Sequence, residues 1–300
     1  DFIPRLEAAQ AVDEALLREV IALLISEAPS VDRTSLINTA FEKVKDKTKF
    51  LELIVKSGIK VGYSYLRKDI AVEILELCEK FDPNLRLGLK YIAQLYSDAG
   101  KYKESINISQ RLIQNSETLT QTIEANCLYL RSLLSAGSWT EVPQIIPDYK
   151  NQLKKLAQLP LESIPKDQAT DMLQLAPFYL NYAEDNPQET RPLQNAVSKI
   201  FQFTAKKTEL NFYPRSHSEK KYLRIGYLGY SLRYHSVGWL ARWLISNHDR
   251  SKFHVTLYLV DSKPDDLTRR LAQNVDHFRQ LDQYTWENAQ RIADDEIDIL

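Results

Sequence analysis

The stretch Leu223-Arg-Ile-Gly-Tyr-Leu-Gly-Tyr-Ser-Leu-Arg-Tyr-His-Ser-Val-Gly-Trp239 is the most informative part of this chain. Its apolar start predicts a β-strand over 223–228, and the residues that follow predict a short turn that contains glycine. A lone histidine, His235, comes just before the start of a predicted helix. Ligands of open α/β sheets bind at the carboxyl ends of the strands, so this turn is a candidate binding or active site.

Strand and helix patterns alternate from this stretch to the end of the chain, which predicts a parallel, Rossmann-like sheet. A parallel strand that is buried on both faces needs a helix after it, and the last predicted strand has none. We therefore expect an incomplete domain and a chain that is part of a longer protein. The predicted strands are Leu223–Leu228, Phe253–Val260, Phe278–Leu281 and Ile297–Leu300, and the predicted helices are Val237–Ile245 with Ser236 as its cap, Asp265–Gln273 and Trp286–Ala293.

The first two-thirds of the chain, residues 1–203, has helical periodicity almost throughout. A turn at Gly100-Lys-Tyr102 and a similar turn at Gly137-Ser-Trp139 resemble the turn between the two helices of a tetratricopeptide repeat. Ser105 and Val142 occupy positions where that repeat usually has alanine. The pattern predicts an α-helical solenoid of stacked helix pairs, and an unrelated helical bundle is the alternative.

Individual helices are also predicted at both ends of this region. Asp32 or Thr34 is the expected cap of an early helix. The segments Gln168–Tyr182 and Glu189–Phe203 predict a late helix pair. The helix nearest the amino terminus is expected to bury an apolar face made of Leu16, Val20, Ile21, Leu23 and Leu24.

The composition is that of a globular protein, with 44% hydrophobic and 26% charged residues. A formal net charge of −1 predicts no general affinity for nucleic acid or acidic membranes. No apolar run is long enough to span a membrane. Cys78 and Cys127 lie inside helical patterns without metal-ligand spacing, so we expect a reducing compartment and a cytoplasmic protein. The predicted domains are a repeat domain at 1–203, a linker at 204–221 and the start of an α/β domain at 222–300.

The sequence from Leu223 to Leu300 resembles the O-GlcNAc transferase/SPINDLY family of glycosyltransferases, especially its bacterial members. The segments that carry the resemblance are Arg224–Tyr227, Arg233–Gly238, His248–Val255 and Ile297–Leu300. Tetratricopeptide-like helices before such a domain are also typical of that family. The resemblance implies a GT-B enzyme with two Rossmann-like lobes, of which this chain contains the start of the first.

The implied activity is inverting transfer of GlcNAc or fucose from UDP-GlcNAc or GDP-fucose to Ser or Thr hydroxyls of proteins, without a metal or other cofactor. In that family the first lobe lies mainly on the acceptor side of the cleft. The second lobe holds most of the nucleotide, so these residues alone are expected to be inactive. The helical repeats are expected to bind the acceptor or a partner protein, and they also offer a surface for self-association.

The resemblance assigns His235 to the family histidine that lies in the cleft near sugar and acceptor. An imidazole there can take a hydroxyl proton or donate a hydrogen bond. We assign substrate-binding roles to its neighbours Gly229, Tyr230, Ser231, Arg233 and Ser236. The sequence departs from the family in two places. Ser231-Leu232 replaces the usual Asp-Phe, so an acidic group near the loop is missing. Tyr91 and Leu128 occupy positions where family repeats often present asparagine, which stands against recognition of acceptor peptides through an asparagine ladder.

Other interpretations of the same residues remain open. The chain could be a non-catalytic scaffold with a vestigial transferase domain, or a transferase for a small molecule or glycan. A lone loop histidine is often a surface or capping residue. Trp239 and Trp243 are expected to pack between helix and sheet rather than to form a sugar-stacking surface. His217, His248, His254 and His277 have no partners at ligand spacing, so no metal site is expected.

Overall fold

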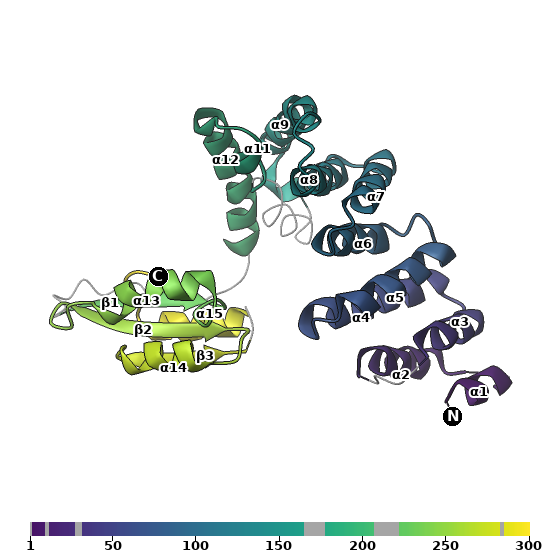
Figure 1. Cartoon of the computed structure of the whole chain (residues 1–300), viewed down its shortest axis with the longest axis horizontal. Coiled ribbons are helices and arrows are strands. Elements are labelled where there is room, and N and C mark those ends of the chain that lie inside the picture. The colour runs from purple at the N-terminus through teal and green to yellow at the C-terminus, as the bar shows by residue number, and fades with distance from the viewer. Residues whose placement is uncertain (1, 10–11, 28–31, 165–177, 207–221, 283–284) are drawn as a thin grey trace. The chain divides into compact units, whose positions relative to one another are not determined.

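The computed structural model describes residues 2–9, 12–27, 32–164, 178–206, 222–282 and 285–300 (Figure 1). The chain divides into two compact parts, which we name the repeat unit (Asp1–Lys207) and the sheet unit (Thr208–Leu300). The division falls within the predicted linker at 204–221, most of which lies outside the described residues. None of the helices within these ranges combines the length and the apolarity that a membrane span requires.

The repeat unit consists of helices that pack against their neighbours in sequence from α4 to α9 (Figure 1). Alternate helices, α4 with α6 and α6 with α8, are also in contact, as expected when one helix pair stacks on the next. The predicted helical solenoid is confirmed. The helices are α1 (Phe2–Ala8), α2 (Glu14–Glu27), α3 (Arg33–Lys43), α4 (Lys47–Ile59), α5 (Lys68–Phe81), α6 (Arg86–Asp98), α7 (Tyr102–Gln114), α8 (Leu119–Ala136), α9 (Val142–Gln158), α11 (Leu180–Ala183) and α12 (Pro187–Lys206), with a π-helical turn at Lys60–Ser64 and a 3-10 turn at Leu161–Ser163.

Both glycine turns lie between paired helices, as the sequence predicts. Gly100 follows α6 with φ +76° and Gly137 follows α8 with φ +72°. Glycine adopts this left-handed conformation without the steric penalty that a side chain would add. The turn after α8 is closed by the Ser138 amide, which donates to the Leu133 carbonyl at 2.9 Å.

Ser105 shows how the repeat accommodates a departure from alanine. Its side chain is completely buried, and its hydroxyl donates to the Ala93 carbonyl at 2.7 Å. The Ser132 hydroxyl lies 2.6 Å from the same Oγ. A buried hydroxyl with satisfied hydrogen bonds avoids the cost of desolvation, so serine fits where the repeat normally has a smaller apolar residue.

A buried ionic cluster joins the first helices of two successive pairs. Glu124 of α8 is only 8% exposed and forms ion pairs with Lys90 at 2.5 Å and with Arg86 at 3.1 Å, both from α6. Arg86 also donates to the Gln121 carbonyl at 2.7 Å. These directional bonds specify how α6 and α8 stack, which apolar contacts alone would leave less well defined.

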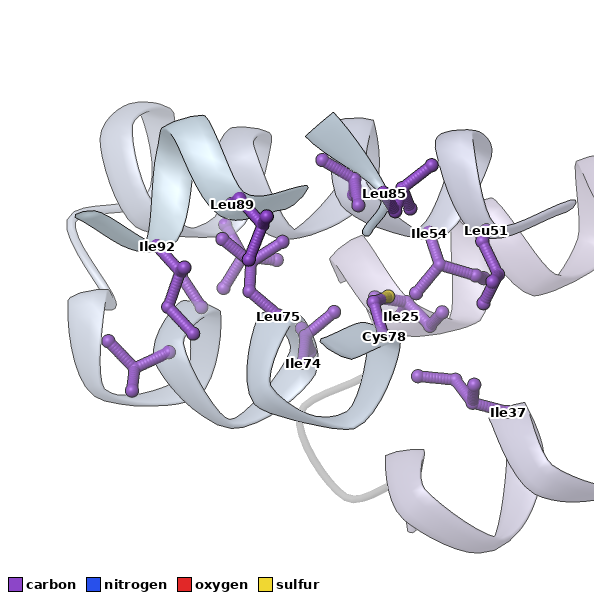
Figure 2. Close-up of a cluster of buried hydrophobic side chains, with 14 of the residues drawn as sticks. Ile25, Ile37, Leu51, Ile54, Ile74, Leu75, Cys78, Leu85, Leu89 and Ile92 are labelled. Carbon is purple, nitrogen blue, oxygen red and sulfur yellow. The ribbon is translucent and has the colours of Figure 1, made fainter. Parts of the chain in front are cut away.

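A continuous apolar core runs through the first eight helices of the repeat unit. Figure 2 shows part of it, with side chains from several helices converging in one layer; it labels Ile25, Ile37, Leu51, Ile54, Ile74, Leu75, Cys78, Leu85, Leu89 and Ile92. Asp32 caps α3 by accepting from the Ser35 amide at 3.1 Å, which confirms one of the two predicted caps.

The predicted apolar face of the first long helix is partly wrong. In α2, Leu17, Ile21 and Ile25 are buried, whereas Leu16 and Leu23 are 59% and 56% exposed. The buried residues are spaced by four, so one row along the helix faces α3 and α4. With leucine on both sides of this row, periodicity alone does not identify the buried face.

The structure describes only part of the predicted late helix pair. Residues 168–177 of the predicted helix Gln168–Tyr182 lie outside the described residues, and α11 covers only its end. The second predicted helix, Glu189–Phe203, corresponds to α12, which extends to Lys206 and so enters the predicted linker.

The sheet unit contains a parallel sheet with the order β1-β2-β3, formed by Leu223–Gly229, Phe253–Val260 and His277–Leu281. Helices α13 (Ser236–Ser246), α14 (Asp266–Gln273) and α15 (Trp286–Asp294) alternate with the strands, as predicted.

The predicted final strand, Ile297–Leu300, is reduced to an isolated parallel bridge between Ile299 and Ile225. The Gly226 amide donates to the Ile299 carbonyl at 2.8 Å, on the side of β1 opposite β2. The order of segments is therefore β3, β2, β1 and then the chain around Ile299, so the sequence order reverses at β1. Doubly wound α/β folds hold their ligands at such a reversal.

Strand β2 is the centre of the sheet unit, because side chains from both of its faces are buried. Leu257 and Leu259 pack toward α13 and α14, in a cluster with Ile245 and Leu271. The opposite face buries a second cluster of Tyr258, Val260 and Leu281, with Ile292 of α15 beside it. Burial on both faces explains why the apolar run at 253–260 is continuous rather than alternating.

We expect Leu75→Ala to lower the free energy of unfolding of the repeat unit by about 2–5 kcal/mol, because the substitution leaves a cavity in the core. Leu75 is 1% exposed, whereas Leu66 is 77% exposed in the same unit. The matched control Leu66→Ala should therefore change stability by less than about 0.5 kcal/mol. Denaturant unfolding followed by far-ultraviolet circular dichroism measures both. Equal effects of the two substitutions would contradict the described core.

Candidate functional site

His235 lies at the point where the turn after β1 becomes helix α13. Its backbone is extended, with φ −149° and ψ 154°, and it is the amino-terminal cap of the helix. Nδ1 of its ring accepts from the Val237 amide at 3.2 Å. The prediction that Ser236 is the cap is wrong, because Ser236 is already helical and is the first residue of α13.

The cap bond has a consequence for the chemistry of the imidazole. A nitrogen that accepts from a backbone N–H carries no proton, so in the neutral ring the proton belongs to Nε2. This tautomer is inferred from the hydrogen-bond network. His235 therefore presents Nε2 as a hydrogen-bond donor as long as it caps the helix, and it is not poised to accept a proton there.

The residues between β1 and His235 form a tight turn. The His235 amide donates to the Arg233 carbonyl at 2.6 Å, and Arg233 Nε donates to the Tyr230 carbonyl at 3.3 Å. The Tyr230 ring meets the imidazole edge to face, with centroids 6.0 Å apart. These contacts bring the predicted site residues Tyr230, Arg233 and His235 together on one short segment.

The remaining predicted site residues differ in accessibility. Ser236 is exposed and its hydroxyl lies 3.5 Å from Nδ1 of His235, whereas Ser231 is only 8% exposed. Gly229 is half-buried at the end of β1. Ser231 has little surface through which to contact a ligand directly, and the substrate-binding roles of all these residues stay predictions.

Asp265, the first residue of the predicted helix Asp265–Gln273, also holds the candidate site. One of its carboxylate oxygens accepts from the Thr268 amide at 3.0 Å, so Asp265 is the cap of α14. The other accepts from the Tyr234 amide at 2.6 Å. The Thr268 hydroxyl donates to the Leu232 carbonyl at 2.9 Å, so the start of α14 binds the turn at two points. The sequence signal is the Asp-x-x-Thr spacing of a capping box, which identifies the cap and not the bond to the turn.

The electrostatics of Asp265 fit this role. Burial opposes its ionisation, but hydrogen bonds from the Thr268 and Tyr234 amides and from the Thr268 hydroxyl outweigh burial and hold its pKa below the usual range. The carboxylate is therefore charged at neutral pH and available as an acceptor for the turn.

Gly238 lets the helix approach the turn closely. A Cβ at this position would lie 2.9 Å from the Ser231 carbonyl oxygen and closer still to the Arg233 carbonyl oxygen. Both are backbone atoms, which cannot move aside as a flexible side chain can. Gly226 has a comparable role within the sheet, where a Cβ would meet Leu300 at 2.9 Å.

The prediction for Trp239 and Trp243 is wrong. Their side chains are 42% and 72% exposed, and Ala241 and Ile245 of α13 pack toward the sheet instead. The Arg242 guanidinium lies 4.4 Å from the Trp239 ring centroid, and the Tyr234 ring lies 5.6 Å from it. The helix is apolar on more than one face, so the sequence does not show which face is covered.

The other histidines have partners that their spacing in sequence does not reveal. The Tyr227 hydroxyl and His248 Nε2 lie 2.7 Å apart at the end of α13. The rings of His254 and His277 lie 4.8 Å apart on neighbouring strands. These contacts arise from the fold and do not contradict the absence of metal-ligand spacing in the sequence; His217 lies outside the described residues.

Tyr91 and Leu128 occupy the two positions where the family's repeats often present asparagine. One of these two positions offers no contact for a peptide. Leu128 is 2% exposed and belongs to the core of the repeat unit, and Tyr91 is partly buried against the same core. At the Leu128 position, a peptide on the repeat surface would have to be recognised by other residues.

We expect Gly238→Ala to destabilise the sheet unit by about 1–3 kcal/mol, because the added methyl group clashes with backbone of the turn. Gly229→Ala is the matched control, since its Cβ would meet nothing closer than 3.7 Å. Three of the four tryptophans belong to the sheet unit, so denaturant unfolding followed by tryptophan fluorescence reports on it. Similar midpoints for the two variants would contradict the close approach.

We expect Asp265→Ala to lower the stability of the sheet unit by about 1–2 kcal/mol, the usual effect of losing a helix cap. Asp266→Ala is the control; this exposed residue makes only an ion pair with Arg269 at 2.5 Å, so its loss should have an effect below about 0.5 kcal/mol. The folded-state pKa of Asp265 is lowered, so its contribution is present above the unfolded pKa, about 3.9, and is lost as pH falls through the folded value. The difference in the free energy of unfolding between wild type and Asp265→Ala should become smaller at acidic pH. An unchanged difference would contradict the role of the Asp265 carboxylate.

No protein-family profile matches the chain, and no curated protein matches it. Among solved structures, the chain is similar to a point mutant of the O-GlcNAc transferase from Thermobaculum terrenum, with 17% sequence identity and a TM-score of 0.48. The match covers 97% of this chain and 46% of that transferase, so the chain spans less than half the length of the protein that it matches. At this identity and score, the likeness carries no argument about the reaction.

Proposed function

We propose that this chain is the repeat region and acceptor-side lobe of a protein O-glycosyltransferase. Its reaction would transfer GlcNAc or fucose from UDP-GlcNAc or GDP-fucose to a Ser or Thr hydroxyl. The proposal rests on the position of His235. This residue lies at the carboxyl end of β1, where the order of the parallel segments reverses. The resemblance of the segment from Arg224 to Gly238 to the transferase family adds the reaction class.

Within this proposal His235 acts as a hydrogen-bond donor. Its Nε2–H would bind an oxygen of the donor or acceptor and stabilise charge that develops during transfer. The hydroxyl proton of the acceptor has to go to another group, because Nδ1 accepts from the Val237 amide and Nε2 already carries a proton. Arg233 and Arg242 add positive charge on the same turn and helix, which suits a donor that contains a diphosphate.

The repeat unit supplies the protein-binding surface in this proposal. Stacked helix pairs present extended surfaces to partner proteins, which can include the acceptor or a second copy of the chain. We place the protein in the cytoplasm. Cys78 and Cys127 are both buried and form no disulfide, which fits a reducing compartment.

A non-catalytic scaffold is the second candidate function, and two observations favour it. Capping of α13 is a sufficient structural reason for a histidine at position 235. Ser231, which replaces the family's acid, is buried and provides no carboxylate. In this alternative the sheet unit would need no donor sugar.

Substitutions at His235 separate the two candidates. His235→Asn keeps a side-chain oxygen that can accept from the Val237 amide, but it removes the Nε2 donor. His235→Ala removes both. If His235 acts in transfer, both variants of the protein from the complete reading frame should lose activity by on the order of 100-fold, and only the alanine variant should lose helix-cap stability.

The measurements are transfer of labelled sugar from UDP-GlcNAc or GDP-fucose to acceptor protein, calorimetric titration with each nucleotide-sugar, and thermal unfolding. His248→Gln, just beyond the opposite end of the same helix, is the control for the loss of a histidine, and its effect on transfer should be small. Wild-type activity in His235→Asn would favour the scaffold, as would failure of the wild-type protein to bind either nucleotide-sugar.

A further inference from the structure

We propose that His254 and His277 form a binding site for a divalent late transition-metal ion, with zinc as its probe. Their rings lie with centroids 4.8 Å apart and planes inclined by 54°. Imidazole nitrogen is a preferred ligand for zinc, copper and nickel. The proposal is independent of the transferase function, because these histidines are not part of the His235 turn.

The strand register brings the two histidines together. His254 belongs to β2 and His277 to β3, and the parallel pairing aligns Thr256 with His277. His254 is two residues before Thr256, so it shares a face of the sheet with His277 and lies diagonally across from it. The spacing of these histidines in the sequence does not resemble a metal-binding motif. Only the register of β2 and β3 brings their rings together.

The separation of the rings fits a shared ion. With a zinc–nitrogen bond of about 2.1 Å and a ring radius of about 1.2 Å, each centroid lies about 3.3 Å from the metal. Two such centroids are about 4.7 Å apart when the ligand–metal–ligand angle is 90° and about 5.4 Å apart when it is tetrahedral. The separation of 4.8 Å lies between these limits.

An unsatisfied atom points to the same conclusion. Among the residues that the structure describes, Nδ1 of His254 is one of the few buried side-chain atoms without a hydrogen-bond partner. A buried polar atom of this kind is normally bonded to a water or an ion. The ring of Tyr222 stacks on His254 at 5.4 Å with an interplanar angle of 23°, so the imidazole has packing partners on the sheet.

The surrounding charges permit a cation at this site. Arg224, which pairs with His254 in the sheet register, forms an ion pair with Glu296, and Arg279 forms a two-point ion pair with Asp295 at 2.5 and 2.7 Å. The guanidinium charges near the pair are therefore largely neutralised by carboxylates.

Thiols do not compete for the ion. Burial raises the pKa of Cys78 and of Cys127 to about 12, so neither is a thiolate at neutral pH. No group of three or more His, Cys, Asp or Glu residues suited to a metal occurs within the described ranges. The site thus has two protein ligands, and water completes the coordination.

Calorimetric titration of the 300-residue chain with zinc chloride, in metal-free buffer without phosphate, tests the proposal. We expect one zinc ion to bind per chain. His277→Gln and His254→Gln should each weaken zinc binding by on the order of tenfold or more. His277 is exposed, so its substitution leaves the fold intact. His248→Gln, in which the lost histidine faces Tyr227 instead, is the matched control and should bind zinc as wild type does.

Nuclear magnetic resonance of the imidazole nitrogens provides a readout without substitution. Zinc should shift the signals of His254 and His277 and leave those of His235 and His248 in place. Absence of zinc binding would overturn the proposal, as would equal binding by wild type and the double variant His254→Gln/His277→Gln. Thermal unfolding of each variant in the presence of a chelator verifies that the comparison is between folded proteins.

Discussion

The hydrogen bond that Asp265 accepts from the turn after β1 is the constraint on which the candidate site depends. One carboxylate caps α14 and at the same time accepts from the Tyr234 amide, so the turn and the next helix are held by a single side chain. This turn also sets the position of His235, whose ring caps α13. Two helix starts and the candidate histidine are therefore coupled through a few short bonds, and Gly238 permits the approach that these bonds require.

This coupling gives His235 a structural and a chemical role through different nitrogens. Nδ1 is used by the helix, and Nε2 is left as a donor at the end of the sheet where ligands of α/β folds bind. A helix cap and a substrate contact are thus compatible in one residue, and substitution by asparagine separates them. Because Ser231 is buried and carries no charge, Asp265 is the acid that stabilises this turn, from the following helix rather than from within the turn.

Polar groups inside both units have a similar role in specifying geometry. Ser105 and Ser132 meet where the repeats normally bury alanine, and Glu124 joins α6 to α8 through two cations. In the sheet unit, the strand register places His254 beside His277 with an unsatisfied nitrogen. Satisfied polar groups define stacking and register, whereas the unsatisfied Nδ1 of His254 is part of the basis for the proposed metal site.

The sequence by itself determined the two kinds of architecture, because helical periodicity, glycine turns such as Gly100 and Gly137, and alternating apolar runs are local patterns. It also placed His235 at the end of β1. Only the tertiary structure decided which side chains meet: that His235 rather than Ser236 caps α13, that Trp239 and Trp243 are exposed, that Leu17 rather than Leu16 is buried, and that residues 297–300 make a bridge instead of a strand. Local patterns define the elements, whereas faces, register and hydrogen-bond partners depend on neighbours that are distant in sequence.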